Sequence, residues 1–106
     1  MIRGTTPDYL LTIDEYDLTD KTVFVTIRQG PTVITKSGNQ LTITVDGEKT
    51  IIAFTLTQWD TLQLSDGKAE VQVRFIDSNG VARATERAEL IVDKVLLERV
   101  ITYAGN

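Results

Sequence analysis

The β-branched residues, and the way they are spaced, constrain this chain most. Thr, Val and Ile occur 16, 10 and 10 times in 106 residues, whereas Ala occurs only 6 times. Such side chains are stiff at χ1 and favour strands over helices. They alternate with polar residues over short stretches, which is the period of a strand that buries one face. The sequence therefore predicts an all-β protein.

Seven segments carry this alternation, and short turn sequences separate them. In the most regular segment, Val23, Val25 and Ile27 alternate with polar or exposed positions. The expected strands are 8–13, 22–29, 32–36, 41–45, 49–56, 68–76 and 81–92. Residues 84–87 are small or polar, so we expect an irregularity there. Many short strands at regular spacing predict one antiparallel two-sheet sandwich over residues 1–106.

Turn and capping residues fix several of the connections. Asp46-Gly47 and the run 77–80 are hairpin sequences, because their glycines adopt positive φ without strain. One short helical turn is expected near 57–62, since Thr57 can cap the amide of Asp60. The acidic segment 14–20 is expected to be a solvated loop, because its spacing does not match that of a calcium-binding EF-hand loop.

The residue types that carry most enzyme chemistry are missing. The chain has no Cys and no His, which excludes thiol nucleophiles, zinc thiolates and the usual general base. We expect no catalytic, metal or cofactor site. A net charge of −4 with only 11 Lys and Arg residues also predicts no nucleic-acid partner.

Neither a signal peptide nor a membrane span is predicted. The first ten residues, MIRGTTPDYL, contain no long apolar stretch of the kind that a signal peptide needs. No run anywhere in the sequence approaches 18 apolar residues, the length required for a transmembrane helix.

The C-terminal segment is the most informative candidate for an interaction. Its apolar residues fit a helix and a strand equally well over 93–101. They can pack on the same domain, or they can form a docking surface, because contiguous exposed apolar patches mark interfaces. We expect Val95 and Leu97 to pack within the domain and residues 100–106 to project toward a partner. Residues 1–3 can likewise either pack on the same domain or dock on another chain. The candidate interface residues are Leu96, Leu97, Val100, Ile101 and Tyr103.

Trp59 is a weaker candidate for ligand binding. A flat exposed ring can stack on a sugar face, which keeps open a small carbohydrate- or ligand-binding module. Aromatic residues make up only 7% of the chain, and Trp59 lies in the expected helical turn. We therefore expect Trp59 and Leu62 to pack this turn onto one end of the sandwich.

Four short motifs lie along nearly the whole chain, from residue 2 to residue 101. They are IRGTTP at 2–7, LTQWDTL at 56–62, VQVR at 71–74 followed by an Asp-X-X-Gly turn, and VLLE at 95–98 before a Val-Ile pair.

Together these motifs resemble small phage and prophage proteins of Gram-positive bacteria. They are similar to the β-sandwich at the N-terminus of upper baseplate proteins. The resemblance implies an immunoglobulin-like sandwich with a structural role in a tail or baseplate. Its partners would be other phage structural proteins or copies of itself, so an oligomer is compatible with it. It implies a location in the bacterial cytoplasm during assembly, or in the virion, and brings no catalytic residues.

Overall fold

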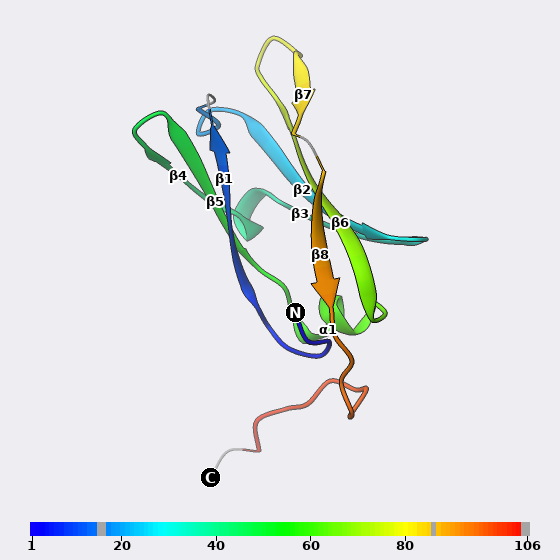
Figure 1. Ribbon diagram of the computed structural model, residues 1–106. Coiled ribbons are helices and arrows are strands. Elements are labelled where there is room, and N and C mark those ends of the chain that lie inside the picture. Colours follow the sequence, from blue (N-terminus) through cyan, green and yellow to red (C-terminus); the bar gives the residue numbers. More distant parts are fainter. Residues whose placement is uncertain (15–16, 86, 105–106) are drawn as a thin grey trace.

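Two antiparallel sheets pack face to face in the computed structural model, which describes residues 1–14, 17–85 and 87–104 (Figure 1). One sheet has the order β1-β5-β4, and the other has β3-β2-β6-β7, with β8 also paired to β6. The strands are β1 (Asp8–Asp14), β2 (Thr22–Gln29), β3 (Thr32–Ser37), β4 (Thr42–Asp46), β5 (Lys49–Thr55), β6 (Gly67–Ile76), β7 (Ala82–Ala84) and β8 (Ala88–Val92). The predicted all-β sandwich is confirmed, and the last predicted strand is divided into β7 and β8.

The chain crosses between the sheets after β1, β3 and β5, and it forms hairpins in between. In an immunoglobulin domain the second strand shares a sheet with the first and fifth strands. Here β2 lies instead between β3 and β6. The sandwich architecture therefore comes with its own strand order.

The core lies between the sheets and consists of the inward positions of the alternating segments. Val25 lies opposite Val73 across β2 and β6, and both side chains are buried. Ile52 and Phe54 of the central strand β5 cover them from the other sheet. The buried apolar residues are Ile13, Leu18, Val23, Val25, Ile27, Ile34, Leu41, Ile52, Phe54, Leu56, Leu64, Ala69, Val73, Phe75 and Val92. The alternation of Val23, Val25 and Ile27 therefore marks a buried face, as the sequence predicted.

One core residue, Leu18, comes from the acidic loop that was predicted to be solvated. Its side chain is completely buried, and its backbone N–H donates to Thr50 Oγ1 over 3.2 Å. The prediction is wrong at this position because a leucine in the crossing between two sheets can fill their open end. Its neighbours Asp17 and Asp20 stay exposed, while Glu15 lies outside the described residues.

The irregularity predicted in the return strand is a β-bulge between β7 and β8. Arg74 pairs with Ala84, whereas Val71 pairs with Ala88, so the return has one residue more than β6 between these two pairs. The backbone N–H of Thr85 donates to the Val73 carbonyl at 2.8 Å, and the Val73 N–H donates to Thr85 Oγ1 at 3.1 Å. A threonine hydroxyl thus accepts the Val73 N–H where the regular ladder is interrupted.

The predicted helical turn is α1 (Gln58–Leu62), and a 3-10 turn, η1 (Gly38–Gln40), lies between β3 and β4. Thr57 Oγ1 accepts from the Asp60 N–H at 3.1 Å, and the Asp60 carboxylate accepts from the Thr57 N–H at 2.9 Å. This reciprocal pair confirms the predicted cap. Neither helical segment of the described chain has the length and apolar content needed to cross a membrane.

Candidate functional site

The C-terminal candidate segment is irregular after β8. Neither the helix nor the strand considered for 93–101 forms, so both readings were wrong. One reason is that β6 begins opposite the last residue of β8, so it offers no pairing partner to the residues that follow. Asp93 pairs instead with Ile2 of the N-terminal segment, in a parallel bridge. The Arg3 N–H donates to the Asp93 carbonyl at 3.1 Å. Residues 1–3 therefore dock on their own chain, although the Ile2 side chain stays half exposed.

All five candidate interface residues are exposed. Leu96 and Tyr103 are almost entirely in solvent, and Tyr103 is 92% exposed. Val100 and Ile101 each leave roughly half of their surface uncovered. Leu97 is also 50% exposed, so the packing predicted for it is only half present, whereas Val95 is partly buried.

Two polar attachments hold this segment against the end of the sandwich. The Gln58 side-chain amide pairs with the backbone of Ile101, with Nε2 donating to the carbonyl at 2.9 Å and Oε1 accepting from the N–H at 2.8 Å. Arg3 forms an ion pair with Glu98 and also donates from Nη2 to the Leu62 carbonyl at 2.8 Å. These bonds bring the C-terminal segment, residues 1–3 and α1 together at one end (Figure 1).

Trp59 lies at this same end, beside Gln58, and it is 64% exposed. The prediction that Trp59 packs α1 onto the sandwich was wrong. The helical turn directs Asp60 and Thr61 into the protein, and Trp59, which precedes them, lies on the solvent side of the turn. The structure thus brings Trp59 and the predicted interface residues to one region. We call the set Ile2, Trp59, Leu96, Leu97, Val100, Ile101 and Tyr103 the apolar end surface.

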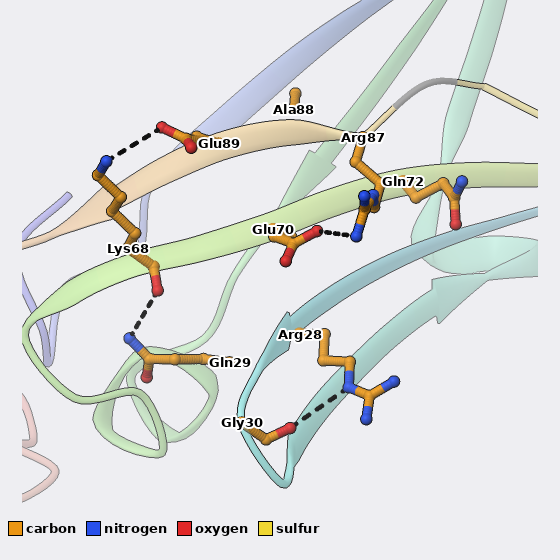
Figure 2. A pocket seen from close by; sticks show the side chains of 9 residues that line it. All are labelled: Arg28, Gln29, Gly30, Lys68, Glu70, Gln72, Arg87, Ala88 and Glu89. Atoms are coloured by element: carbon orange, nitrogen blue, oxygen red, sulfur yellow. Dashed lines mark hydrogen bonds and ion pairs between the residues drawn. The ribbon is translucent and has the colours of Figure 1, made fainter.

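A second surface feature, which the sequence did not indicate, is a polar trough on the outer face of β2, β6 and β8 (Figure 2). Its larger part is an open hollow of about 670 Å³. The residues lining the trough are Thr26, Arg28, Gln29, Gly30, Lys68, Glu70, Gln72, Arg74, Arg87, Ala88 and Glu89. Among the described residues, four cations face two carboxylates here, so these side chains carry a net positive charge in a chain of net charge −4.

Strand register explains the charge arrangement in the trough. Glu70 lies directly opposite Glu89 in the β6–β8 ladder, an unfavourable like-charge pair. Arg87 relieves it with an ion pair to Glu70 at 3.0 Å, and Lys68 lies 3.8 Å from the Glu89 carboxylate. Arg28 faces Glu70 across β2 and β6, but its Nε donates to the Gly30 carbonyl instead (Figure 2).

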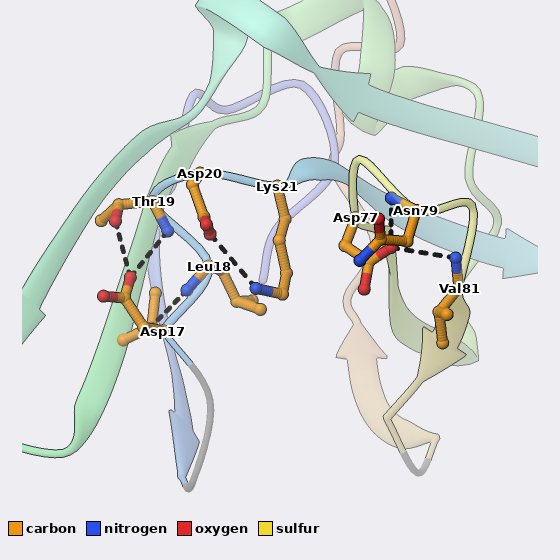
Figure 3. Close-up of polar contacts among 9 residues, drawn as sticks. Asp17, Leu18, Thr19, Asp20, Lys21, Asp77, Asn79 and Val81 are labelled. Carbon is orange, nitrogen blue, oxygen red and sulfur yellow. Dashed lines mark hydrogen bonds and ion pairs between the residues drawn. The ribbon is translucent and has the colours of Figure 1, made fainter.

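The acidic loop and the 77–80 hairpin use their carboxylates to hold local turns (Figure 3). Asp17 accepts from both the N–H and the hydroxyl of Thr19, at 3.0 and 2.6 Å. These two bonds lower the pKa of Asp17. Asp77 accepts from the N–H groups of Asn79 and Val81. Within residues 1–14, 17–85 and 87–104, no three metal-binding side chains come together.

Comparison with known proteins adds no family. Neither a protein-family model nor a curated protein matches the sequence.

Proposed function

We propose that this protein is a non-enzymatic structural or assembly protein of a phage or prophage, associated with a tail or baseplate. The observation that carries the proposal is the apolar end surface, on which seven large apolar side chains are each more than two-fifths exposed. Proteins that act alone rarely expose so much apolar surface in one region. The phage assignment is supported by the resemblance along residues 2–101. The lack of His and Cys supports the non-enzymatic role.

Contact with other proteins is the mechanism of this proposal. The polar attachments at Gln58 and Glu98 hold the C-terminal segment in place while its apolar side chains face outward. A fixed segment loses less conformational freedom on binding than a free tail does. Partners would be other phage structural proteins or further copies of this chain.

The test is a double variant, Leu97→Ser with Ile101→Ser. Because Gln58 bonds only the backbone of Ile101, the polar attachment survives both changes. The matched control is Leu10→Ser with Val33→Ser, since these two side chains are exposed on strands away from the end surface. We expect the C-terminal variant to keep its melting temperature within about 2 °C. It should lose co-purification with virion structural proteins, which the control retains.

A different result would contradict this mechanism. If the C-terminal variant melts well below the control and its association is unchanged, the segment serves the fold and not a partner. The phage assignment has its own check in the genome, where neighbouring tail-fibre, holin or endolysin genes are expected.

A small carbohydrate- or ligand-binding module is the second candidate, and the exposed Trp59 ring favours it. On this alternative, glycan-array binding would be present in the wild type and lost in Trp59→Ala. The structural role predicts no glycan binding by either protein.

A further inference from the structure

We propose that the trough on β2, β6 and β8 binds an acidic polypeptide segment of a partner protein, with Arg28 and Arg74 as its carboxylate anchors. The trough shares no residue with the apolar end surface. The inference therefore goes beyond the proposed function and fails or succeeds separately from it.

The uncompensated charge lies at these two arginines. Glu70 is bound by Arg87, and Glu89 lies beside Lys68. Among the described residues, Arg74 has no ion pair, and Arg28 uses only Nε, on the Gly30 carbonyl. Both guanidinium groups therefore present free N–H forks to the trough. Such a fork matches the two oxygens of a carboxylate.

The spacing of the anchors suits an extended chain. Arg28 lies opposite Glu70, and Arg74 follows Glu70 by four residues along β6. Four residues of a strand span roughly 13 Å. Two acidic residues four positions apart in an extended peptide have the same separation. An extended segment lying along the strands can thus reach both arginines with carboxylates four positions apart.

The lining favours a peptide over other polyanions. Among the described residues, no aromatic side chain lines the trough itself, so bases and sugar rings have no stacking surface along it. The exposed Phe24, opposite Arg74, lines only the adjoining hollow. Glu70 and Glu89 would repel a continuous row of phosphates. Gln72 donates its Nε2 to the Thr85 carbonyl at 2.8 Å, which orients the amide and leaves its oxygen as an acceptor. That oxygen can accept from a peptide N–H.

The experiment measures fluorescence anisotropy with a labelled eight-residue peptide of Ser and Thr that carries Glu at its second and sixth positions. The control peptide has Gln at both positions. The trough variant carries Arg28→Gln and Arg74→Gln together. The matched control variant carries Arg83→Gln and Arg99→Gln, at two arginines outside the trough. Thermal melts verify that each variant folds.

We expect the acidic peptide to bind the wild type and the control, and the trough variant to bind it at least about tenfold more weakly. Raising salt from about 50 to about 300 mM should weaken binding, because the anchors are solvent-accessible charges.

Equal binding of the glutamine peptide, equal loss in both variants, or no binding up to about 1 mM would overturn the proposal. Tighter binding of single-stranded DNA or of an acidic oligosaccharide would overturn it in favour of that polyanion. The wild type could also self-associate in a way that the trough variant loses and the acidic peptide does not inhibit. In that case the trough binds a second copy of this chain and not an acidic segment of a partner.

Discussion

The ion pair between Lys36 and Asp60 fastens α1 to β3, and its removal should destabilise the whole sandwich. Lys36 Nζ lies 2.6 Å from the Asp60 carboxylate, and the side chains are only 10% and 12% exposed. Asp60 also accepts from the Thr57 N–H in the helix cap. Asp60→Ala therefore removes one of the two reciprocal bonds of the capping box, which costs about 1 kcal/mol. It also leaves the Lys36 ammonium without its carboxylate in a site with little water.

Breaking a fully buried pair from one side costs about 3–5 kcal/mol. Since both side chains keep a little contact with solvent, we expect a total loss of about 3 kcal/mol for Asp60→Ala. Lys36→Met should cost less, about 2 kcal/mol, because the Asp60 carboxylate keeps its bond from Thr57. The double variant should lose at least about 1 kcal/mol less than the sum of the two single variants.

The same pair predicts a pH dependence. Burial raises the pKa of Asp60, but hydrogen bonds from Lys36 and from Thr57 outweigh it, and the net pKa lies below the ordinary value. A lowered pKa in the folded state stabilises the protein above the unfolded value of about 3.9. That contribution is lost as the pH falls from there through the folded pKa. The stability difference between wild type and Asp60→Ala should therefore be constant near neutral pH and shrink below about pH 4.

Urea unfolding followed by circular dichroism measures these free energies. The control is the exposed pair Lys68–Glu89, whose side chains are 71% and 65% exposed and whose charges lie 3.8 Å apart. Lys68→Met should change the free energy of unfolding by less than about 1 kcal/mol. A loss for Asp60→Ala no larger than that of this control, or Asp60 and Lys36 losses that simply add, would contradict a buried, coupled ion pair.

Three further predictions concern the turns, the core and the acidic loop. Gly47→Val and Gly80→Val should each cost about 1–3 kcal/mol in urea unfolding, because φ is +65° and +81° at open positions where strain alone acts; no loss at either site would contradict this. Val73→Ala should cost about 2 kcal/mol through the cavity it leaves, clearly more than Gln72→Ala, and equal losses would mean that the inward face is misassigned. Neither EDTA nor calcium should shift the melting temperature, and a calcium-dependent rise that Asp17→Asn abolishes would reveal a metal site.

The strands and turns could be predicted because their signals are local. Alternation in β2 depends on neighbouring residues, and so do the glycine of the β4–β5 turn and the cap formed by Thr57 and Asp60. The residue pairing in that turn shows the limit of such signals. Asp46 pairs with Lys49, so the loop begins at Gly47, one residue later than the Asp46-Gly47 sequence suggested.

Burial of single residues outside strands was harder to predict. Leu18 and Trp59 are both apolar residues among polar ones, yet Leu18 is fully buried and Trp59 is mostly exposed. Their difference depends on which side of a loop or helical turn faces the gap between the sheets. No periodicity reports that, because both segments are too short for a hydrophobic period to define one face.

The fate of the C-terminal segment depended on contacts between the two ends of the chain. The β6–β8 ladder ends at Val92 because β6 begins there, and beyond it Ile2 pairs with Asp93 and Arg3 binds Glu98, more than ninety positions away in the sequence. The trough has the same origin, since Arg28 and Glu70 each read as an ordinary solvated residue of an alternating strand. Only the register of β2 on β6 places them side by side. In this protein, the local pattern determines the two sheets, and long-range register determines which charged side chains meet on their surfaces.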